Sequence, residues 1–384
     1  MPSSTFWPED LGQACLLGRV DLGDGPLPVL VRGGRLEDMS RVAPTSAHLL
    51  ARFPVARAMP AGADIGPADA FEPQAVWSSA GSGRQPRMLA PVDLQCVKAA
   101  GVTFAVSTLE RVIEERARGD AAAADSIRAQ LAARIGRDIA SVKPGSAQAA
   151  ELKAALVADG LWSQYLEVAI GPDAELFTKA PSLSSVGWGD FVGIRSDSQW
   201  NNPEPEVVLV CDPAGQPRGA ALGNDVNLRD IEGRSALLLG KAKDNNASCA
   251  IGPFVRLFDE HYGIDDVRAA TVHLAIDGPE GFRLQGESSM RLISRDPLEL
   301  ASQACGRHHQ YPDGFALFMG TMFAPVQDRD APGQGFTHRV GDRVRVSSGR
   351  LGTLENEVRH CDAAPPWKFG LMALFDNLTR RGLT

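Results

Sequence analysis

The sequence has no apolar run of the roughly 18 residues that a helix needs to cross a bilayer. Its first residues, MPSSTFWPEDLGQ, contain no basic stretch followed by an apolar one, which a secretion signal would require. We therefore expect a cytoplasmic protein with no membrane partner. Lys and Arg number only 39 against 47 acidic residues, so the net charge is -8. Because nucleic-acid binding depends on clustered basic residues, we expect no nucleic-acid partner.

Cysteine is scarce and scattered, with six residues in the chain and no C-x-x-C pair. This spacing fits neither a zinc site nor the framework of a small disulfide-rich protein. We expect all six to be small buried side chains: Cys15, Cys96, Cys211, Cys249, Cys305 and Cys361.

The length of 384 residues exceeds the usual size of a single core, and the 44% hydrophobic and 22% charged residues are typical of a globular protein. The first part is rich in Pro and Gly, with short apolar stretches such as LPVLVRGGRL that predict strands and turns. We predict a small β-rich N-terminal domain over residues 1–92, a larger catalytic domain over 93–360 and a C-terminal tail over 361–384.

A helical insertion is predicted at about 110–162, where Ala, Arg, Glu and Leu recur at helical spacing. Pro144 and Gly145 interrupt it, and Ser146 can then cap a second helix. These two helices either cover the rim of the site or are purely structural. After Trp162, the stretches EPEVVLVCD, TVHLAID and HRVGDRVRVSS alternate as strands do. The tail segment WKFGLMALFDNLTRR is amphipathic and should pack on the domain or on a partner subunit.

Acidic residues in two neighbouring segments suggest a metal site. In WNNPEPEVVLV, Glu204 and Glu206 begin a predicted strand, whose period of two points both carboxylates to one face. An isolated pair of this kind is more often a solvated strand face. In GNDVNLRDIEG, a tight turn at Gly223 and Asn224 can direct Asp225 to the same place, although such an Asp can also merely stabilise its own turn.

Three carboxylates that meet would suit Mg²⁺, which prefers oxygen ligands, and would leave about three octahedral positions for water and substrate. A 2-keto acid bound there would have a polarised ketone, so a proton on the adjacent carbon becomes removable. The base could be Lys243, which follows a predicted apolar strand in LLLGKAKDNNASCAIGP. Partial burial beside a cation would lower its pKa. The residues alone do not choose between Lys243 and Lys241.

These motifs resemble those of the fumarylacetoacetate hydrolase superfamily. GVTFAVSTLE is similar to its G-x-N-Y-x-x-H-x-x-E pattern, NPEPEVVLV to its E-x-E metal strand and GNDVNLRD to its G-N-D-V-[ST]-x-R-D turn. KAKDNNASCAIGP is similar to K-S-F-D-x-x-C-x-x-G-P, which places the family lysine at Lys243. QGESSM, YPDGFALFMGT and VGDRVRVSSGRLGTLENEV follow in the family order, so the resemblance runs from about Gly101 to Val358.

The resemblance implies an α+β fold that is mainly β, the mixed β-sandwich roll of the superfamily, with the small N-terminal domain and the helical insertion added to it. It also implies a homodimer or homotetramer. The cofactor implied is Mg²⁺, for which Mn²⁺ can substitute, and the metal ligands implied are Glu204, Glu206 and Asp225.

One departure from the family pattern bears on the reaction. Ser107 stands where the hydrolases have a His, while Glu110 is retained three residues later. In the hydrolases this His-Glu pair activates water, and a serine cannot act as a general base near neutral pH. Hydrolysis is therefore disfavoured.

Ser107, the segment PDAELFTKAPS and the alanine before the lysine in KAK together resemble the 2-keto-3-deoxy-D-arabinonate or D-xylonate dehydratases. This implies a hydro-lyase that converts a 2-keto-3-deoxy-pentonate to 2,5-dioxopentanoate in oxidative pentose breakdown, including D-xylose degradation. We expect Lys243 to remove the C3 proton and Glu175 to protonate the leaving C4 hydroxide. Ser107, Lys243 and Thr321 would bind the substrate. Asn246 replaces a common family Asp, without a predicted consequence.

Two kinds of alternative remain open. An acylpyruvate hydrolase or an oxaloacetate decarboxylase would use the same metal site, and Ser107 argues against the first more strongly than against the second. A non-catalytic ligand-binding relative would keep the fold, but retention of the three acids and of Lys243 argues against it.

Overall fold

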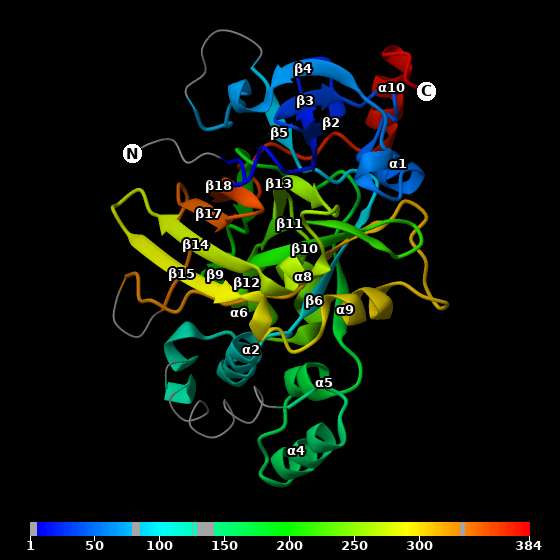
Figure 1. Ribbon diagram of the computed structural model, residues 1–384. Helices are drawn as coiled ribbons and strands as arrows, with labels where there is room; N and C mark the ends of the chain where they lie inside the picture. The colour runs from blue at the N-terminus through cyan, green and yellow to red at the C-terminus, as the bar shows by residue number, and fades with distance from the viewer. Residues whose placement is uncertain (1–5, 79–84, 125, 129–141, 331–334) are drawn as a thin grey trace.

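The computed structural model describes residues 6–78, 85–124, 126–128, 142–330 and 335–384 (Figure 1). Part of the predicted helical insertion, at 125 and 129–141, lies outside the described residues. The strands are β1 Leu16–Asp21, β2 Pro26–Arg32, β3 Arg35–Asp38, β4 Ala63–Pro67, β5 Arg87–Leu89, β6 Cys96–Gly101, β7 Glu175–Ala180, β8 Phe191–Ile194, β9 Asn201–Asn202, β10 Pro205–Cys211, β11 Pro217–Asp225, β12 Asn227–Leu228, β13 Cys249–Leu257, β14 Thr271–Asp277, β15 Arg283–Ser289, β16 Phe315–Phe318, β17 Arg343–Ser348 and β18 Gly352–His360.

The helices of the described residues mostly lie between strands in the chain order. The α-helices are α1 Ser46–Arg52, α2 Ala105–Ala117, α4 Ala147–Ala158, α5 Gln164–Ile170, α6 Arg229–Glu232, α7 Leu239–Lys243, α8 Ile264–Ala269, α9 Pro297–Ala304 and α10 Leu371–Arg380. The short 3-10 helices are η1 Ala56–Ala58, η2 Ala68–Ala70, η3 Ala236–Leu238 and η4 Met290–Leu292.

The large sheet has 11 strands, in the order β4-β3-β2-β1-β13-β11-β10-β16-β6-β7, with β5 paired to β1. The hairpin between β2 and β3 turns at Gly33 and Gly34, which both have positive φ, as a two-residue hairpin turn requires. The N-terminal strands continue the sheet, because β1 is hydrogen bonded to β13 with Leu16 opposite Arg256. The separate domain predicted for residues 1–92 remains a prediction.

A second sheet of five strands, in the order β15-β14-β17-β18-β8, packs on the large one. In β14, β17 and β18, buried residues alternate with half-buried or exposed ones, as expected when one face covers a core. β10 is buried on both faces: Val207 and Leu209 pack in the core between the sheets with Leu274 of β14, whereas Val208 and Val210 pack in the core on the other side. The predicted α+β, mainly β fold of packed mixed sheets is thus confirmed.

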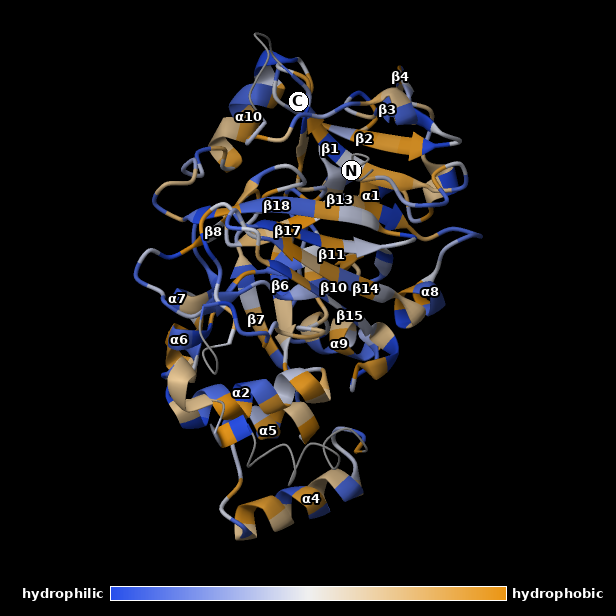
Figure 2. Ribbon diagram, turned by 90° about the vertical axis from the view of Figure 1, so that its left-hand side faces the viewer, coloured by the Kyte–Doolittle hydropathy of each residue, from blue (hydrophilic) through white to orange (hydrophobic). Residues whose placement is uncertain are grey.

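The predicted helical insertion begins earlier than expected, with α2 at Ala105. Ser146 caps α4 as predicted, since its hydroxyl accepts a hydrogen bond from the Ala149 amide. α2, α5 and α4 lie together at the end of the molecule opposite the N-terminal strands (Figures 1 and 2). α2 contributes residues to the lining of the candidate site described below, whereas the described residues of α4 contribute none.

The C-terminal tail packs on the N-terminal part of the sheet. In α10, Leu374 and Leu378 are buried, and the Asn377 amide donates to the Asp24 carbonyl in the β1–β2 hairpin, at 2.8 Å. Three of the cysteines are buried and three are half-buried, and all six are free thiols. In the described part of the chain, no helix is both long and apolar enough to span a membrane.

Candidate active site

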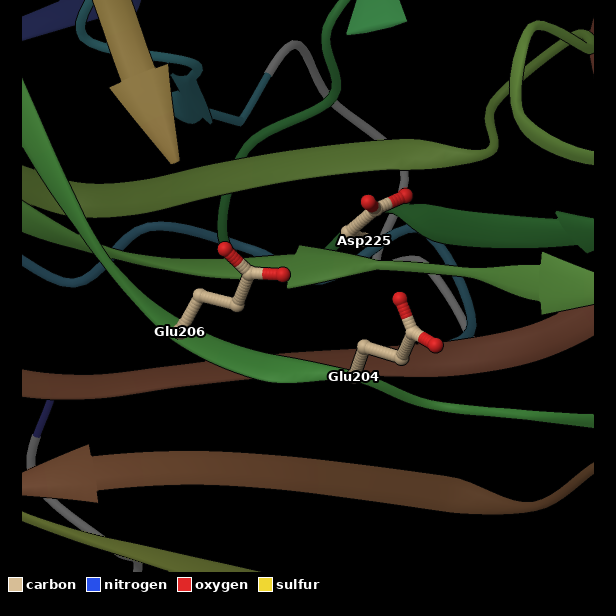
Figure 3. A group of neighbouring side chains, drawn as sticks. All are labelled: Glu204, Glu206 and Asp225. Atoms are coloured by element: carbon tan, nitrogen blue, oxygen red, sulfur yellow. The ribbon is translucent and has the colours of Figure 1, made fainter. Parts of the chain in front are cut away.

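Three carboxylates converge at one end of β10 and β11, and we call them the acid cluster: Glu204, Glu206 and Asp225. Glu204 directly precedes β10, Glu206 lies within it, and Asp225 ends β11. The two strands are antiparallel neighbours, with Glu206 opposite Gly223. One oxygen from each side chain lies within 4.8 Å of the others, and all three residues are buried. Figure 3 shows the three side chains as neighbours on adjacent strand segments.

The tight turn predicted at Gly223 and Asn224 is wrong, because both residues belong to β11 and pair with β10 and β13. Gly223 is needed for space instead. A Cβ built there would lie 2.3 Å from the ring of Phe318 and 2.6 Å from Val208. Asp225 therefore reaches the acid cluster as the last residue of β11.

Three buried cations surround the acid cluster. Lys243 pairs with Glu204 and, at 3.1 Å, with Asp225 Oδ2. Lys179 lies 2.8 Å from Asp225 Oδ1, and its ammonium also donates to the Lys243 carbonyl. Arg111 pairs with Glu204. Lys179 lies in one of the sequence motifs, PDAELFTKAPS, but nothing in that motif marked it as a site residue. No motif marked Arg111 as a site residue either.

The strand predicted before Lys243 is wrong. The stretch forms η3 and α7, with the Ser235 hydroxyl accepting from the Leu237 amide at the start of η3. Leu237 is 96% exposed, so this apolar run is not a buried strand. Lys243 is the last residue of α7, and its side chain is buried.

The pKa values of these groups reflect burial and crowded negative charge. Burial, together with repulsion from Asp225 and Glu204, raises the pKa of Glu206 well above its usual range. Burial opposes ionisation of Glu204 too, but Lys243 and Arg111 outweigh it and hold its pKa at about 2. Burial tends to lower the pKa of Lys243, yet attraction to Asp225 and Glu204 raises it.

The acid cluster opens into a small cavity, which we call the site cavity. It is lined by Ala100, Gly101, Val102, Ser107, Arg111, Glu175, Phe177, Glu204, Glu206, Asp225, Glu232, Lys243 and Thr321. All seven residues predicted for the site from the sequence are in this set. Their roles as ligands, base, acid and binding residues remain predictions.

The donor set of the site cavity fits a divalent cation. Its lining has five acidic side chains and two basic ones. In the described part of the chain, no ion pair joins Glu206 to a Lys or Arg. Its carboxylate accepts hydrogen bonds from the Gly320 amide, at 2.7 Å, and from the Thr321 hydroxyl, at 3.5 Å. Carboxylate oxygens are the ligands that Mg²⁺ prefers.

Of the remaining predicted residues, Glu175 lies in β7, Ser107 in α2 and Thr321 in the loop after β16. Glu175 begins β7, and burial raises its pKa although Arg111 and Lys243 lower it. Ser107 lies in α2, where its hydroxyl donates to the Phe104 carbonyl at 2.8 Å and can still accept a hydrogen bond from the cavity side. A carboxyl group that stays protonated more readily than usual can act as a proton donor.

Two acids near the cavity have contrasting environments. Glu232, at the end of α6, lines the cavity; burial raises its pKa to about 7, and it lies 3.3 Å from Arg111. It belongs to the GNDVNLRDIEG motif, but nothing in that motif distinguished it. Glu110 does not line the cavity. Its carboxylate accepts hydrogen bonds from Arg128 and Arg229, at 2.8 to 2.9 Å.

Comparison with known proteins identifies relatives for about half of the chain. A probable 2-keto-3-deoxyxylonate dehydratase of Haloferax volcanii is 31% identical over 194 residues, 50% of this chain and 63% of the relative. A 2-dehydro-3-deoxy-D-arabinonate dehydratase of Saccharolobus solfataricus is 31% identical over 188 residues, 48% of this chain and 58% of the relative. The matched region thus spans less than two thirds of either relative. No family model matches the sequence.

Solved structures match nearly the whole fold. Apo 2-keto-3-deoxy-D-arabinonate dehydratase has a TM-score of 0.63 at 20% identity, covering 90% of this chain and 99% of that chain. The same enzyme complexed with magnesium and 2,5-dioxopentanoate has a TM-score of 0.60 at 19% identity over the same shares. Fumarylacetoacetate hydrolase from Exiguobacterium antarcticum has a TM-score of 0.56 at 16% identity, covering 90% of this chain and 100% of that chain. The chain therefore has the fold of fumarylacetoacetate hydrolase, and the resemblance predicted from its motifs is confirmed.

Proposed function

We propose that the protein is a Mg²⁺-dependent dehydratase that converts a 2-keto-3-deoxy-pentonate, of the D-xylonate or D-arabinonate type, to 2,5-dioxopentanoate. The observation that carries this proposal is the lining of the site cavity, which combines the acid cluster with a lysine and a buried carboxyl group. The curated relatives named for this reaction, and the solved complex with magnesium and 2,5-dioxopentanoate, support it.

Glu204, Glu206 and Asp225 would hold the cation, with Mn²⁺ as a substitute for Mg²⁺. When bound, the cation would polarise the 2-keto group and would offset the carboxylate attraction that raises the pKa of Lys243. Lys243 then takes a proton from C3. The Lys179 ammonium donates to the Lys243 carbonyl and so fixes the end of α7 that carries this base.

Glu175 gives its proton to the hydroxide that leaves C4, so water is lost. Loss of a proton from C5 and gain of one at C3 then shift the C3–C4 double bond to C4–C5. Ketonisation of this enol, with loss of the O–H proton and gain of one at C4, gives the C5 aldehyde of 2,5-dioxopentanoate. Ser107 and Thr321 would orient the polyol end through hydrogen bonds, which restricts the substrate to a reactive geometry.

Two observations disfavour hydrolysis by the same site. Ser107 supplies no general base, and Glu110 is bound by two arginines rather than facing the cavity. Among the described residues that line the cavity there is no histidine. The described lining thus lacks the His-Glu pair that activates water in the hydrolases.

The test is to incubate the protein and Mg²⁺ with 2-keto-3-deoxy-pentonates, acylpyruvates and oxaloacetate, and to identify the products by NMR. We expect 2,5-dioxopentanoate from the pentonates and no pyruvate above background from acylpyruvates. Rapid release of pyruvate from an acylpyruvate would indicate a hydrolase, and release of pyruvate and CO₂ from oxaloacetate alone would indicate a decarboxylase.

A further inference from the structure

Gly101 lies directly beneath the carboxylate of Glu175. β6 and β7 are antiparallel neighbours, and Gly101 is the residue opposite Glu175 in their register. A Cβ built on Gly101 would lie 1.9 Å from Glu175 Oε2 and 2.6 Å from its carboxyl carbon. Any side chain at residue 101 and the present position of Glu175 therefore exclude each other.

Backbone conformation does not explain this glycine. Its φ lies outside the left-handed region, so an L-residue could adopt the same backbone there. The next residue, Val102, does have a positive φ of 52° although it is β-branched. The glycine is thus placed where space is needed and not where conformational freedom is needed.

We propose that Gly101 is a positioning residue that admits the Glu175 carboxylate to the site cavity. The inference rests on the proposed function insofar as Glu175 is the proton donor. A methyl group at residue 101 would push the carboxylate away by at least about 1 Å, and a misplacement of that size can slow a reaction roughly 100-fold.

The packing part of the inference is tested by thermal unfolding of Gly101→Ala, Glu175→Ala and the double variant. We expect Gly101→Ala to lower the Tm and the additional Glu175→Ala to remove that loss, because the colliding carboxylate is gone. Glu175→Gln should not remove it, since glutamine has the same length and shape. Gly12→Ala is the control, because its Cβ would meet nothing within 4 Å. If Gly101→Ala lowers the Tm equally in the wild-type and the Glu175→Ala backgrounds, the inference is overturned.

The catalytic part is tested by dehydration rates. We expect Gly101→Ala to lower kcat roughly 100-fold with little change in KM, and the double variant to be no slower than Glu175→Ala. Losses that multiply in the double variant, or a Gly101→Ala protein with the wild-type rate, would overturn it. If Glu175→Ala keeps the wild-type rate, the proposed role of Glu175 fails instead, and the Tm comparison still decides whether Gly101 makes room for its side chain.

Discussion

At the scale of single residues, Glu206 is the member of the acid cluster whose negative charge is balanced least by neighbouring basic residues. Its pKa is raised by burial and by its two acidic neighbours, and among the described residues it has no Lys or Arg partner. We expect Glu206→Gln to raise the Tm of the metal-free protein by on the order of 2 °C, because a buried carboxyl group whose ionisation is opposed by two neighbouring carboxylates is replaced by a neutral amide. The same change should abolish the rise in Tm on adding Mg²⁺.

Thermal melts in EDTA and in Mg²⁺, with calorimetric titration of the metal, check this expectation. Glu151→Gln is the matched control, since Glu151 is exposed on α4. A Glu206→Gln protein that binds Mg²⁺ as tightly as the wild type would show that Glu206 is not a ligand.

A second prediction separates the roles of Lys243 and Glu175. Lys243→Met should neither dehydrate the substrate nor exchange its C3 hydrogens with D₂O, because no positioned base remains. Glu175→Gln should dehydrate slowly yet still exchange C3 hydrogen, since proton removal precedes the step that Glu175 serves. NMR of the substrate in D₂O measures both. Persistent exchange with Lys243→Met, or none with Glu175→Gln, would mean that base and acid are assigned wrongly.

The sequence predicted which residues line the cavity better than it predicted which secondary structure carries each of them. Motif order was enough to select Lys243 over Lys241, and the structure buries the first and exposes the second. Glu232 was missed because its burial depends on α6 packing against α2, a contact between residues more than 100 positions apart. The same holds for Arg111, whose partner Glu204 is 93 residues away.

At the scale of elements, Asn246 links the loop after α7 to the C-terminal tail. Its amide nitrogen donates to the carbonyls of Cys361, at 3.0 Å, and Pro365, at 3.1 Å, and its Oδ1 accepts from the Trp367 amide. An aspartate, common at this place in the family, could not donate either bond. Asn246, whose presence in place of the family Asp had no predicted consequence, therefore holds the tail through these hydrogen bonds.

We accordingly expect Asn246→Asp to loosen the tail and to lower the free energy of unfolding by about 1 kcal/mol, a modest figure because the site is partly exposed to water. Limited proteolysis should cleave the tail after residue 365 faster than in the wild type. Asn245→Asp is the control, since its amide nitrogen donates to the Lys241 carbonyl and not to the tail. Equal cleavage rates in the two variants would contradict this account.

At the scale of the whole molecule, local patterns predicted β10, β14 and β17: β10 contains a continuous apolar run, and in β14 and β17 buried residues alternate with more exposed ones. Local patterns do not record which distant strands pair. The sequence therefore suggested a separate N-terminal domain, which remains a prediction. In the structure the strands of this part extend the large sheet through β1 and β13. Phe254 of β13 also packs in one core with Val20 and Val29 of the N-terminal strands.

The final prediction follows from this continuity. A chain that begins at residue 93 would lose β1 to β5, leaving β13 as an unpaired edge and exposing Phe254 to water. Since an exposed apolar edge strand invites association, we expect this fragment to aggregate or to lack a cooperative unfolding transition. A chain that ends at residue 370 loses only α10, which buries few side chains, and should keep both the transition and Mg²⁺ binding. Circular dichroism melts and size-exclusion chromatography compare the two. A monodisperse fragment of residues 93–384 that unfolds cooperatively would show instead that the N-terminal strands are a separate domain.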